Sequence, residues 1–176
     1  MGSRAAVDQV LARLVKAGEI KRIKRGLFVK PVRNASAGEV LPGAEDVARF
    51  LAKQTGAKLA INGAEAARRF GFTTQVSSES VFQTDGPSRE YHVGNHKVRL
   101  KRVAPRKLAL SGRPAGDALS ALWYLGRNEV TPQTFEQIEG RLPPEEFSTL
   151  VEKQEIMPGW MRDSLIRYQE EERQVA

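Results

Sequence analysis

The chain has 176 residues, no cysteine and a formal net charge of +7, so it forms neither disulfides nor cysteine-ligated zinc sites. It contains no apolar run of about eighteen residues and no apolar segment at its N-terminus, which predicts a cytoplasmic protein without a membrane span or a secretory signal. Residues 1–112 carry 21 Lys and Arg against 9 Asp and Glu, a net of +12, whereas residues 113–176 carry 7 against 12, a net of −5, so we expect an anionic partner for the first part.

The first predicted element is an amphipathic helix over residues 2–18. Ser3 suits the position that caps the start of a helix, and Gly18 suits the left-handed position after its end. The apolar residues recur at helical spacing and form one stripe: Val7, Val10, Leu11 and Leu14. The opposite side carries small, polar and basic residues, which would let the helix backbone approach another surface, such as the floor of a groove.

Two short strands around a basic turn follow this helix, with Lys24, Arg25 and Gly26 at the turn. A helix that can enter a major groove, followed by a basic hairpin, is typical of the recognition helix and wing of a winged helix-turn-helix. Residues 1–31 hold eight Lys and Arg against two Asp and Glu, a net of +6, as expected of a phosphate-binding surface. The combination favours DNA binding over a basic face that is merely solvated.

The middle of the chain predicts a small α+β domain. Residues 32–43 show little periodicity and are interpreted as a linker. Over residues 44–112 we expect two short helices, a strand near 57–61, and then a meander of three antiparallel strands between 80 and 103. In the third strand of the meander, apolar residues alternate with three cations: Lys97, Arg99 and Lys101. These form a candidate second basic face for nucleic acid or an acidic protein, although an edge strand protected by charge is the interpretation that we favour.

Residues 113–176 predict helices only, over 115–125, from Thr131 onwards, over 142–154 and over 158–173. Trp123 and Trp160 are expected in the core of this part. The predicted fold class is therefore α+β, with a partial N-terminal winged helix over 1–31, a linker over 32–43, a small mixed α/β domain with antiparallel strands over 44–112, and C-terminal helices over 113–176.

No enzyme motif supports catalysis. The chain lacks a P-loop, a Gly-x-Ser-x-Gly and a His-Glu-x-x-His sequence, so we expect no catalytic residue, no cofactor and no metal. Asp85 begins the loop Asp-Gly-Pro-Ser-Arg and is interpreted as a turn-forming residue rather than as a catalytic acid. His92 and His96 flank a hairpin turn, but no cysteine accompanies them, so a metal site is not favoured.

Several segments resemble AbiEi-type antitoxins, in the same order along the chain. They are Gly2-Ser-Arg-Ala-Ala-Val-Asp-Gln9, Gly18-Glu-Ile-Lys-Arg-Ile-Lys-Arg-Gly-Leu-Phe28, Ala60-Ile-Asn-Gly-Ala-Glu-Ala-Ala67, Gly71-Phe-Thr-Thr-Gln-Val76 and Thr84-Asp-Gly-Pro-Ser-Arg89. The glycine at position 126, after a Trp-Tyr-Leu helix end, agrees as well. The resemblance covers about residues 2–126.

The resemblance implies an antitoxin of a type IV toxin–antitoxin system. Such proteins join a winged-helix transcriptional repressor of their own operon to an antitoxicity domain, and their partner is an AbiEii-type nucleotidyltransferase toxin. The resemblance places the DNA contacts in the helix and the wing, at Ser3, Arg4, Gln9, Arg13, Lys24 and Arg25. The expected partners are therefore operator DNA and the toxin, and no membrane.

One departure from the family pattern concerns the start of the winged helix. The family has two helices before the recognition helix, whereas the pattern here begins at the recognition helix itself, so the apolar stripe lacks its usual packing partners. We expect a fragment of residues 32–176 to neutralise the toxin without repressing the operon. Two alternatives stay open: an antitoxicity or scaffold domain that works only through protein contacts, and an enzyme that acts on a nucleic acid or on the modified product of a toxin.

Overall fold

The computed structural model describes residues 3–24, 26–34, 38–76, 79–93 and 96–175. Its first helix, α1 (Arg4–Lys16), begins and ends where the sequence predicts. The Ser3 hydroxyl accepts a hydrogen bond from the Ala6 N–H, and Gly18 has φ 73°. The backbone N–H groups of Gly18 and Glu19 donate to the last free carbonyls of the helix, which is the Schellman arrangement. Local hydrogen bonds therefore define both ends of α1.

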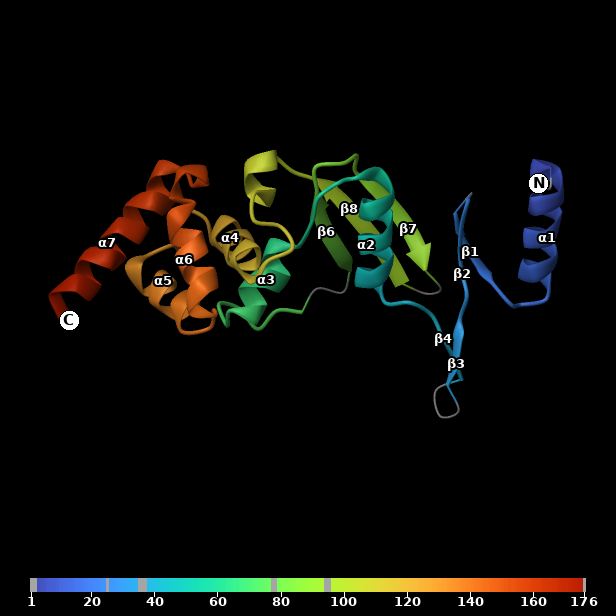
Figure 1. The fold of residues 1–176 in the computed structure, drawn as a ribbon. Coiled ribbons are helices and arrows are strands. Elements are labelled where there is room, and N and C mark those ends of the chain that lie inside the picture. The colour runs from blue at the N-terminus through green and yellow to red at the C-terminus, as the bar shows by residue number, and fades with distance from the viewer. Residues whose placement is uncertain (1–2, 25, 35–37, 77–78, 94–95, 176) are drawn as a thin grey trace.

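The apolar stripe of α1 is only partly covered, because Leu11 and Leu14 are half-buried whereas Val7 and Val10 are exposed. None of the residues of α1 is buried, and the side chains of Val7 and Val10 are 51% and 42% exposed. Figure 1 shows α1 at one end of an elongated molecule and the C-terminal helix at the other. The stripe that the sequence predicts is present, but the described residues bury none of its side chains fully.

Two hairpins connect α1 to the rest of the chain. β1 (Lys21–Lys24) and β2 (Leu27–Val29) pair antiparallel around the predicted basic turn. The segment 32–43, which we interpreted as a linker, contains a second antiparallel hairpin of β3 (Val32–Asn34) and β4 (Gly38–Val40). The β-branched Val32 and Val40 lie opposite each other in this hairpin and form a favourable cross-strand pair. Each strand has only three residues, which is too short for a clear alternating pattern in the sequence.

A four-stranded sheet follows, and its order differs from the predicted meander. Its strands are β5 (Leu59–Ile61), β6 (Ser80–Thr84), β7 (Arg89–Val93) and β8 (His96–Arg102). The order is β5-β6-β8-β7, and β6 runs parallel to β8. The last strand is thus inserted between its two predecessors, so it is a central strand and not an edge strand. Val98 and Leu100 on β8 are buried on the face of the sheet that shares a core with α2.

The first of two buried cores lies between this sheet and α2 (Ala44–Thr55), which covers one face of the sheet (Figure 1). Val47 and Leu51 on α2 share the core with strand residues such as Val98. Leu27 on β2 belongs to the same core and is 5% exposed. The first hairpin is therefore joined to the sheet by packing, although the sequence groups it with α1.

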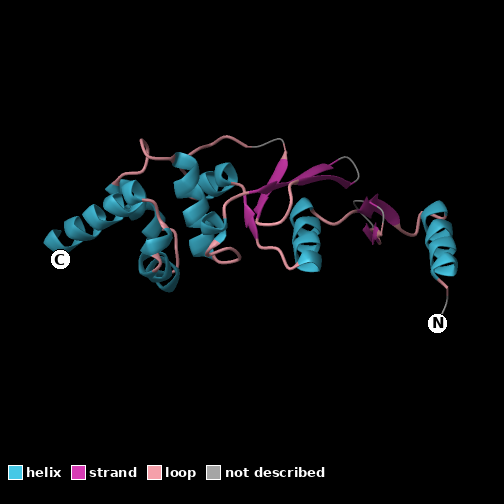
Figure 2. Ribbon diagram, turned by 90° about the horizontal axis from the view of Figure 1, so that it is seen from above, coloured by secondary structure: helices cyan, strands magenta, loops and turns pink. Residues whose placement is uncertain are grey.

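The second core is helical and holds the larger number of buried side chains. Its helices are α3 (Gly63–Arg69), α4 (Pro114–Leu125), α5 (Pro132–Glu139), α6 (Pro144–Glu152) and α7 (Gly159–Val175), accompanied by the short 3₁₀ turns η1 (Pro105–Leu108) and η2 (Gln154–Ile156). Figure 2 shows these helices gathered in the C-terminal part, with the strands between them and α1. None of the described helices is long and apolar enough to cross a membrane.

The predicted boundary at residue 112 divides these cores incorrectly. α3 lies before it in sequence but packs on α4, and its Ala66 and Ala67 are fully buried in the helical core. A Cβ on Gly63 would lie 2.7 Å from the Cβ of Tyr124, so the two helices approach each other closely. Small side chains in α3 permit this contact. Because α3 directly follows β5 in the sequence, it was predicted to belong to the sheet domain.

The start of α4 is capped from a different helix, and this leads to a test. The Glu146 carboxylate accepts hydrogen bonds from the Ala115 N–H and from the Arg113 guanidinium. These bonds hold the pKa of Glu146 below its ordinary value of 4.5. The ionised carboxylate therefore stabilises the fold above that value, and the contribution is lost as the pH falls through the lowered pKa.

We expect Glu146→Gln to lower the melting temperature at neutral pH and to have little effect well below pH 4.5, the ordinary carboxyl value. Thermal unfolding followed by circular dichroism at both pH values measures this. Glu145→Gln is the matched control, because Glu145 is the exposed neighbour on the same helix. Equal losses at both pH values would contradict the role of the carboxylate charge.

Candidate functional site

The outer face of α1 carries polar and basic side chains that are exposed to solvent. At about 100° per residue, Gln9, Arg13 and Lys16 lie within about 60° of one another on the side opposite the apolar stripe. All three are exposed, and neither cation forms an ion pair with any residue that the structure describes. Ala5 and Ala12 lie beside them, next to Lys16, so the helix backbone can approach a ligand closely on this side.

The other residues predicted in the helix do not join this face. Ser3 uses its hydroxyl to cap the helix. Arg4 lies nine residues before Arg13 in one continuous helix, so the two side chains point in nearly opposite directions, about 180° apart. Helical spacing in the sequence also places Lys16 opposite the stripe, although Lys16 was not among the predicted DNA contacts.

The wing cation Lys24 is held by the sheet. Its Nζ lies 5.0 Å from the centre of the ring of Tyr91 on β7, a cation–π contact, and the side chain is half-buried. Tyr91 itself is buried in the sheet core. Lys24 would have to leave this ring to reach a groove, so it anchors the hairpin. The predicted neighbour Arg25 lies outside the described residues.

The second predicted basic face is largely neutralised. Lys97 pairs with Glu90 at 3.1 Å, and Arg99 pairs with Glu79 at 3.0 Å. The ion pair with Lys97 is the main cause of a lowered pKa for Glu90. Glu90 lies directly opposite Arg99 in the predicted β7–β8 hairpin, so the ion pair between these two residues, at 3.5 Å, could be predicted from the sequence. Lys101 is the member of the face that has no ion pair among the described residues.

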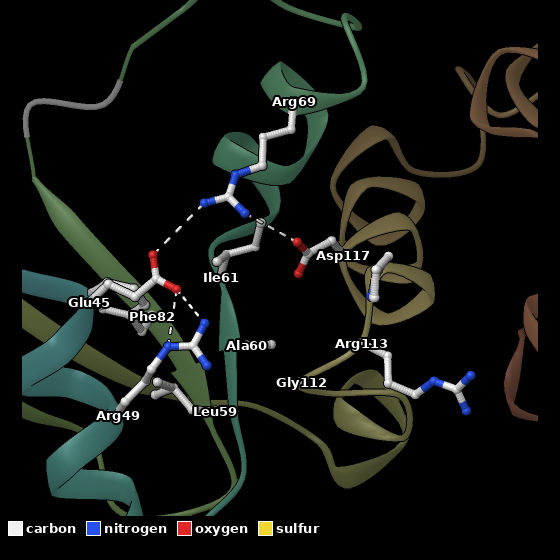
Figure 3. A pocket seen from close by; sticks show the side chains of 11 residues that line it. Glu45, Arg49, Leu59, Ala60, Ile61, Arg69, Phe82, Gly112, Arg113 and Asp117 are labelled. Carbon is white, nitrogen blue, oxygen red and sulfur yellow. Dashed lines mark hydrogen bonds and ion pairs between the residues drawn. The ribbon is translucent and has the colours of Figure 1, made fainter. Parts of the chain in front are cut away.

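A cavity of about 190 Å³ lies where α2, α3 and α4 meet. Arg69 reaches between Asp117, at 3.2 Å, and Glu45, at 4.0 Å, while Arg49 binds the same glutamate (Figure 3). Burial raises the pKa of Asp117, and the adjacent arginine acts in the opposite direction. Both carboxylates are thus occupied by guanidinium groups, and the cavity is smaller than most ligand pockets. We interpret the ion pairs around this cavity as a structural network that joins the two cores.

The remaining candidates, Asp85 and the two histidines, do not form a metal site among the described residues. The carboxylate of Asp85 accepts a hydrogen bond from the backbone N–H of Lys58 at 2.8 Å, so it fixes the start of β5 against the turn. His92 is exposed on β7, and the side chain of His96 lies outside the description. Within the described residues, no three His, Cys, Asp or Glu side chains are grouped as metal ligands would be.

A comparison with protein families gives one match. A family model described as a family of unknown function (DUF6088) matches residues 1–150. No curated protein and no solved structure matches the chain. The matched range includes α1, both hairpins, the whole sheet and most of the helical core.

Proposed function

We propose that this chain, which belongs to the DUF6088 family of unknown function, binds DNA through the outer face of α1. The observation that carries the proposal is the exposed face of Gln9, Arg13 and Lys16, whose two cations have no counter-charge among the described residues. Cations that protein carboxylates do not neutralise are available for phosphates, and their binding releases counterions from the DNA.

The face also has the shape that groove binding requires. A helix fits into the major groove of B-DNA, and side chains on its outer face reach base edges and phosphates. Gln9 offers the amide that pairs with adenine in two-pronged fashion, while Arg13 and Lys16 flank it as phosphate contacts. In this proposal, α1 acts as the recognition helix of a winged-helix-like unit, and the β1–β2 hairpin supports it from the sheet.

We expect Arg13→Gln with Lys16→Gln to weaken binding to all DNA sequences and to reduce the salt dependence. The slope of log K against log salt should become flatter by about 0.9 for each phosphate that the variant no longer neutralises. Gln9→Ala should instead cost about 1–3 kcal/mol on the preferred sequence, because a base contact is removed. Fluorescence anisotropy of labelled duplexes at several salt concentrations measures both effects.

Arg4→Gln is the matched control for this experiment. Arg4 is an exposed cation on the same helix, but it points away from the proposed face. Its replacement should leave the salt slope nearly unchanged. A control variant that loses as much affinity as the double variant would place the DNA elsewhere on α1, and binding without salt dependence would remove the electrostatic argument altogether.

The biological role that we propose is that of an antitoxin and repressor of its own operon. The resemblance of the segments between residues 2 and 126 to AbiEi-type antitoxins supports this role, and its partner would be a nucleotidyltransferase toxin. The charge division supports it as well, since the basic N-terminal part suits DNA and the part from residue 113 onwards carries a net of −5 for another task.

A fragment of residues 19–176 tests this division of labour in cells. It removes α1 but keeps the first hairpin, whose Leu27 belongs to the sheet core. Co-expressed with the partner nucleotidyltransferase, it should still protect growth, while a promoter reporter should lose repression. If the fragment is folded by circular dichroism and gives no protection, then neutralisation requires α1 and the proposed division is wrong.

The alternative is a domain that works only through protein contacts. The exposed part of the stripe, with Val7 and Val10, favours it, because exposed apolar surface on one side of a helix marks interaction sites. In that case Val7→Gln with Val10→Gln should abolish protection, while the full chain should show no salt-dependent DNA binding.

A further inference from the structure

Basic side chains gather beside one tryptophan where η1 packs against α4. The guanidinium carbon of Arg106 lies 4.9 Å, and the Nζ of Lys107 4.5 Å, from the centre of the ring of Trp123. Lys101, near the end of β8, adds to the positive charge that lowers the pKa of Lys107. We call Lys101, Arg106, Lys107 and Trp123 the Trp123 cluster.

This cluster has no counter-charge among the residues that the structure describes. Residues 91–116 contain neither Asp nor Glu, and none of the three cations forms an ion pair with a residue in the described part of the chain. Burial, followed by the nearby Arg106 and Lys101, lowers the pKa of Lys107. Lys97 and Arg99, on the same strand as Lys101, are each paired with a glutamate. The lack of an acidic partner therefore distinguishes the Trp123 cluster from these two cations.

The ring of Trp123 limits where the cations can go. Trp123 is half-buried and meets Trp160 edge to face at 6.1 Å, so its position is fixed by packing. Cation–π contacts with a fixed ring restrict the two side chains from η1 and so reduce the entropy cost of ordering them around a ligand. The guanidinium supplies a planar fork of donors and the ammonium a point charge, which together suit a tetrahedral oxyanion.

We propose that the Trp123 cluster binds a phosphate group. A phosphate supplies the missing negative charge and accepts several hydrogen bonds at once, so it relieves the repulsion among the three cations. The phosphate can belong to a nucleic-acid backbone or be a free ion. η1 lies in the middle of the molecule and α1 at its end (Figure 1), so this site does not depend on the DNA-binding face of α1.

The two tryptophans of the chain provide the assay. In the full-length Trp160→Phe variant, Trp123 is the sole tryptophan, and its emission reports on the adjacent cations. Titration with inorganic phosphate, and separately with a DNA duplex, at constant ionic strength should give a saturable change in emission. Adding Arg106→Gln and Lys107→Gln should weaken the response at least about tenfold, because two charged hydrogen-bond donors are removed.

Arg162→Gln with Arg167→Gln is the matched control, since both are exposed cations on α7, and it should respond like the parent. Isothermal titration calorimetry of the chain with both tryptophans, with and without the Arg106 and Lys107 changes, gives the same comparison without the Trp160 substitution. A response to phosphate and DNA supports a general phosphate site, and a response to DNA alone supports a phosphodiester site.

Two results would overturn the proposal: no response to either probe, or equal affinity in the chain that lacks the Arg106 and Lys107 charges. The DNA proposal for α1 is judged separately. If Arg13→Gln with Lys16→Gln abolishes DNA binding while phosphate still changes the Trp123 emission, both proposals stand. If phosphate binds at Trp123 but the full chain has no affinity for DNA, the proposed function fails and this inference does not.

Discussion

Replacing Leu27 by alanine is expected to lower the free energy of unfolding by about 2–5 kcal/mol. Leu27 is 5% exposed and belongs to the core between α2 and the sheet, although it lies on the first hairpin. Its removal leaves a cavity beneath the hairpin, whose remaining attachments include the packing of Ile23 and the cation–π contact of Lys24 with Tyr91. Urea unfolding at equilibrium, followed by circular dichroism, measures the loss.

Val32→Ala is the matched control, because Val32 is an aliphatic residue of the next hairpin with a side chain that is 69% exposed. It should change stability by no more than about 0.5 kcal/mol. Similar losses in the two variants would show that the first hairpin is not packed as described. The same argument revises the expectation for residues 32–176, since that fragment lacks Leu27 and should unfold more readily than residues 19–176.

Gly116→Ala should have the second large effect, a loss at or above the roughly 1–3 kcal/mol that is usual for overpacking. Gly116 lies in the first turn of α4, and the chain entering that helix passes directly over it. A Cβ at this position would lie 2.0 Å from the carbonyl oxygen of Leu110, a backbone atom that cannot rotate away. The segment between η1 and α4 would have to move, and it also carries Leu110, which is buried in the helical core.

Gly159→Ala provides the comparison for the same chemical change. Gly159 begins α7, and a Cβ there would meet no atom within 4 Å. Because alanine has the higher helix propensity, this variant should be neutral or slightly more stable. Thermal unfolding of the two variants side by side gives the answer, and a Gly116→Ala protein as stable as the parent would contradict the close approach at Leu110. In a destabilised variant, a changed Trp123 emission would also report that η1 had shifted.

Features that local hydrogen bonds and side-chain spacing control could be predicted from the amino-acid sequence alone. Ser3 and Gly18 define the ends of α1, Gly56 ends α2 with φ 67°, and Thr131 forms a capping box at the start of α5. These signals act within a few residues, so they were readable without the fold. The α+β class, the positions of the main helices and the pairing of the first hairpin and of β7 with β8 were predicted for the same reason.

Features that depend on contacts between distant residues became visible only in the folded molecule. The insertion of β8 beside β6, the attachment of α3 to the helical core and the burial of Leu27 by α2 follow from packing, which the local pattern does not encode. Packing also determines which cations are available to a partner, because a carboxylate that the fold brings close can neutralise a basic side chain. Lys97 and Arg99 are paired with glutamates, whereas Arg13 and Lys16 on α1, and the cations of the Trp123 cluster, have no acidic partner in the described chain.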